Sequence, residues 1–245
     1  MTPAGAEPHP AWYALRGGGW RDYVTLLHPP YTAWHLAYVV VGGCLAPAVA
    51  WGRLGLTVLA FFLAMGVGAH ALDELHGRPL RTAIPSGALV ALAVASVAAA
   101  CAIGIAVAIA FDPLLLAFVA AGAFLVPAYN LELLGGAFHG DLWFALAWGA
   151  FPVLTGYAAV AGTVGAEALL AAGWATALSL AQRRLSTPVR RLRREVREVR
   201  GELELVTGGR EPLGRAELTG APEAALRLLA IATVLAAAAL AVARL

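Results

Sequence analysis

The segment HALDELHGRPLRT, which begins at His70, places ionisable side chains at the end of a strongly apolar stretch. His70, Asp73 and Glu74 fall within about one helical turn, and Arg78 and Arg81 follow. Residues three and four apart share a face of a helix, so the first three side chains project to one side. Carboxylates hold Mg²⁺, and arginines bind phosphate oxygens through paired hydrogen bonds. This pattern favours a phosphate site, with a solvated helix end as the alternative.

Two later apolar stretches also end in polar residues. The candidate substrate-binding residues there are Tyr129, Asn130, Gln182, Arg183 and Arg184. Glu132 lies close to Asn130, and His139 and Asp141 follow in a segment that reads on its own as an ordinary loop. Taken together with the first cluster, these residues predict one polar mouth that suits an anionic ligand with an apolar tail.

The elements that must position these residues are membrane helices. Of 245 residues, 60% are hydrophobic and 13% are charged, and the mean hydropathy is +0.75. An average soluble domain has about 25% charged residues. The apolar runs are long and do not alternate with polar residues, as the strands of a membrane barrel would. The sequence therefore predicts an all-α integral membrane protein.

Other features of the composition exclude some functions. All 17 basic residues are arginine, so a retinal protein, which needs a lysine Schiff base, is excluded. Cys44 and Cys101 lie in apolar runs without a CxxC motif and read as small buried side chains. We expect no cleavable signal peptide at the N-terminus, and no nucleic-acid partner.

A membrane span needs about 20 apolar residues, and on this measure the chain has about seven spans. They are expected near 34–51, 54–75, 87–110, 113–134, 141–163, 165–182 and 223–243. The chain then divides into an N-terminal segment (1–33), a six-helix membrane core (34–182), a charged helix and linker (183–222) and a C-terminal span (223–245).

Arginines predict the orientation of these spans. Arg16 and Arg21 precede the first span, and a dense set between 183 and 200 follows the sixth, whereas the opposite side has only Arg53 and Arg244. By the positive-inside rule, the N-terminus is cytoplasmic and the C-terminus lies outside the cell membrane. The polar mouth then faces the cytoplasm.

The charged segment after the sixth span predicts an amphipathic helix over 185–206. Apolar residues recur at spacings of three and four between Leu185 and Val206, and Thr187 and Pro188 suit the start of a helix. Such a helix can lie on anionic membrane lipids through its arginines. A short coiled coil with a protein partner is the alternative.

Three segments resemble the UbiA superfamily of intramembrane prenyltransferases, which transfer a prenyl chain from its diphosphate to an acceptor. They are LLHPPYTAWHLAYVVVGG, HALDELHGRPLRTAIPSG and AYNLELLGGAFHGDLWFALAWGAFPVLTGY. The likeness covers roughly residues 20–190 and implies a UbiA-like bundle, an isoprenoid diphosphate substrate and Mg²⁺. The family usually has about nine spans, whereas this chain is expected to have seven.

The resemblance transfers only in part to the family's acidic motifs. His70 stands where the family has Asn, Ala71 and Arg78 stand where it has Asp, and Glu74 keeps its acidic character with Asp73 beside it. No acidic residue occupies the second motif, where Ser179, Gln182, Arg183 and Arg184 stand.

The resemblance implies Asp73 and Glu74 as Mg²⁺ ligands, with His70 beside them in the catalytic cluster. The arginines then bind the diphosphate, and Arg183 and Arg184 act as fixed cations in place of metal. Two other functions stay open. One is a non-catalytic relative that binds a lipid phosphate or scaffolds a membrane partner. The other is a metal protein that uses His70, Asp73, Glu74, His76 and His139.

Overall fold

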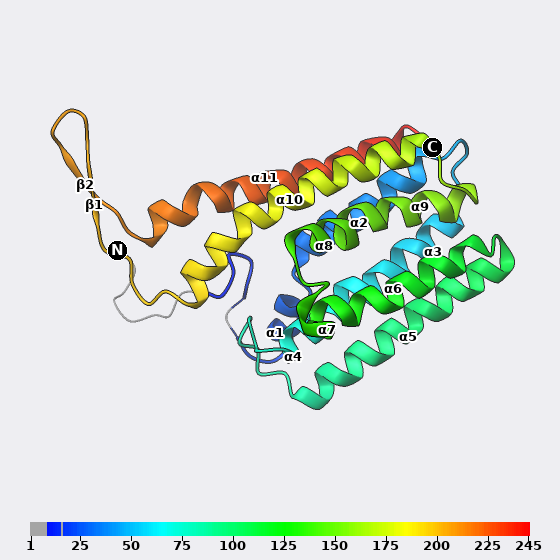
Figure 1. The fold of residues 1–245 in the computed structure, drawn as a ribbon, viewed down its shortest axis with the longest axis horizontal. Coiled ribbons are helices and arrows are strands. Elements are labelled where there is room, and N and C mark those ends of the chain that lie inside the picture. Colours follow the sequence, from blue (N-terminus) through cyan, green and yellow to red (C-terminus); the bar gives the residue numbers. More distant parts are fainter. Residues whose placement is uncertain (1–8, 16) are drawn as a thin grey trace.

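The computed structural model describes residues 9–15 and 17–245, and the described chain is mostly helical. The prediction that uses Arg16 falls outside these residues. Long helical segments lie side by side (Figure 1). They are α2 (Pro29–Leu45), α3–η1–α4 (Trp51–Phe61, Phe62–Ala69, His70–Leu75), α5 (Ser86–Ala110), α6 (Leu114–Asn130), α8–η2–α9 (Asp141–Ala145, Leu146–Ala150, Phe151–Ala161), α10 (Ala166–Arg194) and α11 (Arg215–Val242). Shorter elements are α1 (Trp20–Leu26), α7 (Leu133–Gly136), β1 (Glu202–Glu204) and β2 (Arg210–Pro212).

Four of these segments are long and apolar enough to cross a membrane. They are Trp51–Leu75, Ser86–Ala110, Asp141–Ala161 and Arg215–Val242, and α6 is a shorter apolar helix. The fold is thus that of an all-α membrane protein. The predicted spans at α2, at α6 and in the first part of α10 do not reach the same length and hydropathy, so the count of seven stays a prediction.

Helix α2 packs against α9 through glycines. A Cβ atom on Gly42 would lie 2.0 Å from the carbonyl oxygen of Val153, and a Cβ atom on Gly156 would lie 2.2 Å from that of Val39. Only glycine fits at either position, because the two backbones touch there. Small residues allow this close approach where lipid supplies no hydrophobic driving force between helices.

The central core lies between α2, α9 and α10. Trp34 and Tyr38 of α2 are fully buried there, and the indole Nε1 of Trp34 donates a hydrogen bond of 2.6 Å to the hydroxyl of Tyr38. The Tyr38 hydroxyl also accepts a longer bond of 3.5 Å from Ser179 of α10. This satisfies the polar ends of two large aromatic side chains inside the bundle.

Two arginines cap helix ends far from the predicted mouth. Arg53 donates hydrogen bonds to the carbonyls of Ala159 and Val160 at the end of α9. Arg244 donates to the carbonyls of Cys44 and Ala46 at the end of α2. Both arginines satisfy carbonyl groups that a helix leaves without intrahelical partners.

The predicted amphipathic helix over 185–206 is helical only as far as Arg194, as the end of α10, and is wrong beyond that residue. Helix α10 continues without a break from the sixth predicted span through Pro188 to Arg194, and β1 and β2 then form an antiparallel hairpin. Contacts of α10 along α11 support the helix beyond Pro188 (Figure 1). The alternation Glu202, Leu203, Glu204 before Gly208 is a hairpin signal that the helical periodicity concealed.

Other boundaries also move. The C-terminal helix α11 begins at Arg215 and not at 223, so little of the predicted linker remains. The first long helix, α2, occupies 29–45 and not 34–51, and α1 precedes it inside the predicted N-terminal segment. Pro29 and Pro30 start α2 because proline fits the first turn of a helix, where its missing N–H is no loss.

Candidate functional site

A polar cavity of about 510 Å³ opens at the end of the bundle where α4 and α6 stop. The segment 10–13, the start of α2, the η1–α4 rod, the end of α6, the α8–η2 rod and the last turns of α10 all line it. Elements far apart in sequence thus meet around one space. This is the predicted mouth, although its walls come from more of the chain than the sequence indicated.

Two π-helical segments shape the inner end of the cavity. Met65 and Ala69 of η1 line it on one side, and Trp148 of η2 lines it on another. Each π segment widens its helix locally, and such segments are frequent at functional sites.

Imidazole rings in fixed orientations face this inner end. Nδ1 of His70 bonds to the carbonyl oxygen of Gly66 at 3.1 Å, and Nδ1 of His35 bonds to that of Trp148 at 2.7 Å. A backbone carbonyl only accepts, so each Nδ1 carries the proton and each Nε2 is left as an acceptor.

Two more residues support this wall. The hydroxyl of Tyr13 lies 2.6 Å from Nδ1 of His28, and the ring of His28 stacks on that of His70 with 4.1 Å between centroids. Burial lowers the pKa of His28 well below its usual range, and His70 and the nearby arginines lower it further. Burial likewise raises the pKa of Tyr13. Both groups are therefore neutral at pH 7.

The positive charge of the cavity comes from α10. Arg183, Arg190, Arg193 and Arg194 all line the space. They recur at helical spacing and so share one side of α10. The resulting row of guanidinium groups is a binding surface for an anion such as a phosphate.

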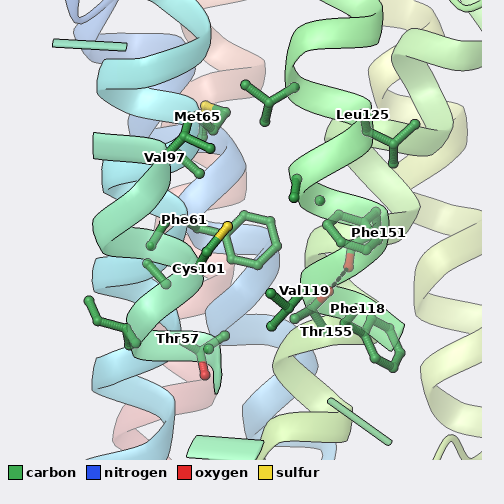
Figure 2. Close-up of a pocket in the computed structure, with 18 of the residues that line it drawn as sticks. Thr57, Phe61, Met65, Val97, Cys101, Phe118, Val119, Leu125, Phe151 and Thr155 are labelled. Carbon is green, nitrogen blue, oxygen red and sulfur yellow. Dashed lines mark hydrogen bonds between the residues drawn. The ribbon is translucent and has the colours of Figure 1, made fainter. Parts of the chain in front are cut away.

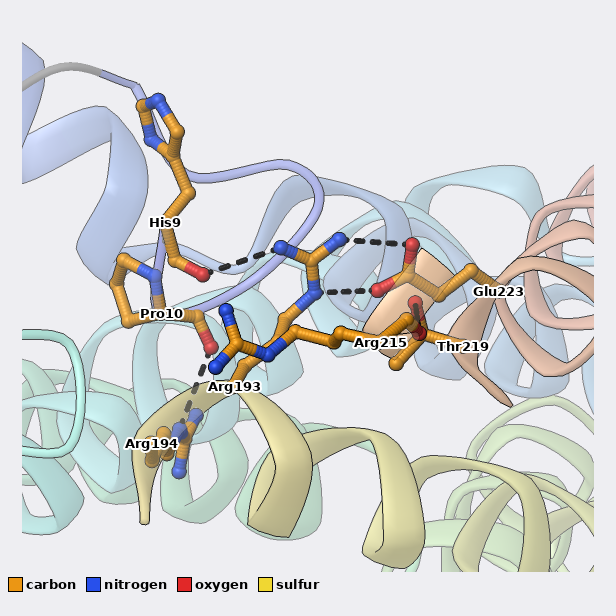
Figure 3. A network of polar contacts seen from close by, with 7 residues as sticks. All are labelled: His9, Pro10, Arg193, Arg194, Arg215, Thr219 and Glu223. Atoms are coloured by element: carbon orange, nitrogen blue, oxygen red, sulfur yellow. Dashed lines mark hydrogen bonds and ion pairs between the residues drawn. The ribbon is translucent and has the colours of Figure 1, made fainter. Parts of the chain in front are cut away.

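The arginines differ in whether a carboxylate of the protein already pairs with them. Nε of Arg183 forms an ion pair of 3.0 Å with Asp141. Arg193 makes two bonds to the carboxylate of Glu223 on α11, at 2.5 and 2.8 Å (Figure 3). Arg190 forms no ion pair with a described residue, and Arg194 donates only to the carbonyl of Pro10. Arg190 and Arg194 are therefore the cations that are most available to a ligand.

The N-terminal segment covers the arginines. Arg193 donates to the carbonyl of His9 at 3.3 Å and Arg194 to that of Pro10 at 3.4 Å (Figure 3). The next residues, Ala11, Trp12 and Tyr13, line the cavity. Nothing in the sequence of this segment indicated a role at the cavity.

Asp73 is the carboxylate nearest the middle of the wall. It lines the cavity and makes no hydrogen bond or ion pair with a described residue, and Arg190 and Arg194 act on it electrostatically. The other lining carboxylates, Glu132 and Glu195, are exposed at the rim. Asp73 can therefore interact with a ligand or with a cation that accompanies one.

Glu74 has a different role from the one predicted. It is fully buried, it does not line the cavity, and its two oxygens accept bonds from the N–H of Leu80, the N–H of Thr82 and the hydroxyl of Thr82. The carboxylate holds the loop after α4 in place. The geometry does not bring Asp73 and Glu74 together as a ligand pair.

Arg78 serves the same loop. Its guanidinium donates to the carbonyls of Thr82 and Ile84 and to the hydroxyl of Ser86. Arg81 reaches the carbonyl of Arg194 outside the cavity, and Arg184 is exposed on the outer side of α10. These predicted phosphate ligands therefore lie elsewhere.

Six predicted site residues do meet at the cavity: His70, Asp73, Tyr129, Asn130, Gln182 and Arg183. The buried amide oxygen of Gln182 has no partner among the described residues. Asn130 donates to the carbonyl of Val126 at 2.7 Å, which fixes its amide at the end of α6.

Sequence reasoning missed His28, His35 and the distal arginines of α10 as parts of one site. The spacing of Arg183, Arg190 and Arg194 was a usable signal, because steps of seven and four keep residues on one helical face. Nothing local marked His35, since its partner Trp148 lies 113 residues away.

The residues present do not fit the Mg²⁺ arrangement that the resemblance implies. That arrangement needs two acidic clusters, whereas Asp73 has no second carboxylate beside it in the cavity wall. The described residues contain no group of three or more His, Cys, Asp or Glu side chains placed to hold a metal. A role for Mg²⁺ stays a prediction.

An apolar pocket of about 100 Å³ adjoins the polar cavity. It lies between α3–η1, α5, α6 and α9, and Figure 2 shows the sulfur of Cys101 close to the ring of Phe61 inside it. Met65 and Trp148 line both the pocket and the cavity. The two spaces are therefore neighbours that share one wall.

Comparison with known proteins adds nothing to this geometry: no family model, no curated protein and no solved structure matches the chain.

Proposed function

We propose that the chain is a UbiA-like intramembrane isoprenoid enzyme that binds an isoprenoid diphosphate. The diphosphate lies against α10 in the polar cavity, and the prenyl chain lies in the apolar pocket. The observation that supports this most is the wall that both spaces share, formed by Met65 and Trp148. An anion-binding subsite next to an apolar subsite matches an amphiphile with one negatively charged end.

The head group is held by arginine. Arg190 and Arg194 have no carboxylate partner among the described residues, and Arg183 extends the row along α10 away from Arg194. Guanidinium groups bind phosphate oxygens with two parallel bonds and keep their charge when they are partly buried. The amide oxygen of Gln182 at the same wall has no partner among the described residues, but as an acceptor it does not bind the diphosphate oxygens.

The tail is held by close packing of small and aromatic residues. Gly104 allows Val119 of α6 to pack directly against α5, Gly122 lies against the ring of Phe151, and Phe118 and Phe151 stack at the far end with 6.0 Å between centroids. An apolar chain gains about 25 cal/mol for each Å² that it buries in such a site.

The reaction assigned to the site is prenyl transfer. Carbon 1 of the substrate lies at the shared wall, its bond to the diphosphate oxygen breaks, and the arginines stabilise the charge on the leaving group. The acceptor then bonds to carbon 1.

The orientation follows from the same arginines. Those of α10 mark the cytoplasmic end, so the substrate enters from the cytoplasmic leaflet. Exposed residues of this end, including Arg184 and Arg191, lie near anionic lipid headgroups.

A second candidate is a non-catalytic lipid-phosphate binder. It is favoured by the lining carboxylates, because only Asp73 lies inside the cavity while Glu132 and Glu195 are exposed at its rim, and arginines alone can bind a phosphate without activating its departure.

A thermal-shift titration of the purified protein in detergent with geranylgeranyl diphosphate tests the proposal. We expect stabilisation in the wild type and a loss of at least about tenfold in affinity in Arg190→Gln and Arg194→Gln, equivalent to about 1.4 kcal/mol. Arg184→Gln is the matched control, because it removes a guanidinium from the same helix outside the cavity. Equal loss in all three variants, or no stabilisation of the wild type, refutes the site.

The titration is repeated with Mg²⁺ and with a chelator, together with an assay for diphosphate release. Release of diphosphate supports the enzyme, whereas binding that is indifferent to Mg²⁺ and without release supports the binder. Asp73→Asn is expected to abolish release and to leave binding by the arginines in place.

The tail pocket is tested separately with Cys101→Phe. The added ring fills the space beside Phe61, so geranylgeranyl diphosphate should bind more weakly while dimethylallyl diphosphate is unaffected. Ala98→Phe, on the exposed side of the same helix, is the control. Equal affinities for the long chain in both variants rule out this pocket as the tail site.

A further inference from the structure

His35 and His70 present the same atom to the inner end of the cavity. Each uses Nδ1 to bond a backbone carbonyl, that of Trp148 for His35 and that of Gly66 for His70. Neither Nε2 has a hydrogen-bond partner among the described residues, and neither is sealed from the cavity as Nε2 of His28 is. Both rings are thus neutral acceptors held in place by their other nitrogen.

These acceptors lie at the boundary of the two spaces. The carbonyl that fixes His35 belongs to Trp148, and the carbonyl that fixes His70 follows Met65 in the chain. Trp148 and Met65 are the two residues through which cavity and pocket share a wall. Carbon 1 of a prenyl diphosphate bound as proposed above therefore lies beside the two rings.

The other imidazoles of the cavity differ in what surrounds Nε2. His139 also bonds a backbone carbonyl through Nδ1, that of Tyr129 at 2.9 Å, but its Nε2 faces Glu132 at 3.8 Å near the rim, and His76 is exposed. His28 stacks on His70 and holds its own Nδ1 against Tyr13. His28 is thus a positioning residue for His70, and His139 offers a matched control.

We infer that His35 and His70 form the subsite of the second substrate, a hydroxyl-bearing acceptor whose proton one of the Nε2 atoms takes. This inference rests on the proposed function. In the step, the acceptor oxygen forms a bond to carbon 1 and the bond between carbon 1 and the diphosphate oxygen breaks. The diphosphate leaves with the electron pair toward α10, and the hydroxyl proton moves to Nε2, so atoms and charges balance.

Nitrogen NMR of the full chain in detergent, with ¹⁵N-labelled histidine, tests this directly because the chain has only six histidines. We expect His35 and His70 to show a protonated Nδ1 and an unprotonated Nε2. The probe 1-naphthol, added with geranylgeranyl diphosphate, should move the Nε2 signal of at least one of these two rings toward the protonated range. His35→Gln and His70→Gln assign the signals, and His139→Gln should leave both shifts unchanged.

A protonated Nε2 in the wild type, or naphthol shifts absent from both rings, overturns the inference. Both shifts are measured on the wild type, and the variants serve only to assign its signals. The thermal shift with geranylgeranyl diphosphate is measured on the same samples: if it persists while the naphthol shifts are absent, the acceptor subsite fails and the diphosphate site stands. If the thermal shift is also lost in the wild type, the proposed function itself fails.

Discussion

Adjacent residues Asp73 and Glu74 show how strongly local surroundings decide the role of a side chain. Both are carboxylates on one short helix, yet Asp73 lines the cavity with no partner among the described residues and Glu74 is buried against a loop. The difference comes from the main chain after Gly77, which turns back and directs the N–H groups of Leu80 and Thr82 at Glu74.

Glu74→Gln is expected to destabilise the protein by about 1.5–3 kcal/mol, because the amide can no longer accept all three bonds that the carboxylate accepts. Asp73→Asn should change stability by less than about 0.5 kcal/mol, as is usual away from buried networks. Denaturant titration in detergent measures both. Equal effects would mean that Glu74 does not hold the loop.

At the scale of elements, the glycine contact between α2 and α9 sets the geometry of the bundle. It brings His35 of α2 beside Trp148 of η2, and η2 continues directly into α9. The position of His35, a candidate proton acceptor, therefore depends on the glycine contact at which α2 crosses α9.

Gly156→Ala is expected to cost at least about 1–3 kcal/mol, because its Cβ would overlap the carbonyl of Val39 and separate the helices. Gly55→Ala on α3 meets no atom within 4 Å and should be neutral or stabilising by up to about 1 kcal/mol. The free energies of unfolding of the two variants are compared in mixed micelles. A neutral Gly156→Ala would show that the backbones are not in contact there.

The ion pair between Arg193 and Glu223 joins α10 to α11. Glu223→Gln leaves a mostly buried guanidinium without its partner, so we expect a loss of about 1.5–3 kcal/mol in the free energy of unfolding. Glu202→Gln in the hairpin removes an exposed pair with Arg210 and should have no measurable effect. Denaturant titration of both variants measures the two effects. Similar midpoints would contradict the prediction that the buried pair stabilises the fold more than the exposed pair does.

On the scale of the whole molecule, the two ends of the bundle differ in chemistry. The cavity, the arginines of α10 that line it and the hairpin gather at one end, and the C-terminus lies at the other (Figure 1). Arg53 and Arg244, at this second end, are engaged with helix carbonyls. The positive charge that can bind ligands and lipids therefore lies at one end of the bundle.

We expect a cysteine at Gly209 to react with an impermeant maleimide only from the cytoplasmic side. A cysteine at Leu245 should react only from outside, in a background where Cys44 and Cys101 are replaced by alanine. The positive-inside rule gives this direction. Labelling of intact cells and of inverted vesicles distinguishes the sides, and the opposite pattern would invert the topology and place the cavity outside.

The sequence by itself determined that the chain is helical and apolar enough for a membrane, because hydropathy and helical period are local properties. It also located part of the polar mouth, since residues near His70 and Tyr129 end apolar stretches. It did not reveal the hairpin after α10, where two periodicities competed over the same residues.

Only the tertiary structure decided which polar atoms remain free. Glu74 and Arg78 look like ligands in the sequence, but in the folded chain both make hydrogen bonds to the loop after α4. His35 looks like an ordinary helix residue, yet its partner is 113 positions away. Whether a side chain can bind a ligand depends on which hydrogen bonds it already makes, and those bonds form between segments that only the folded chain brings together.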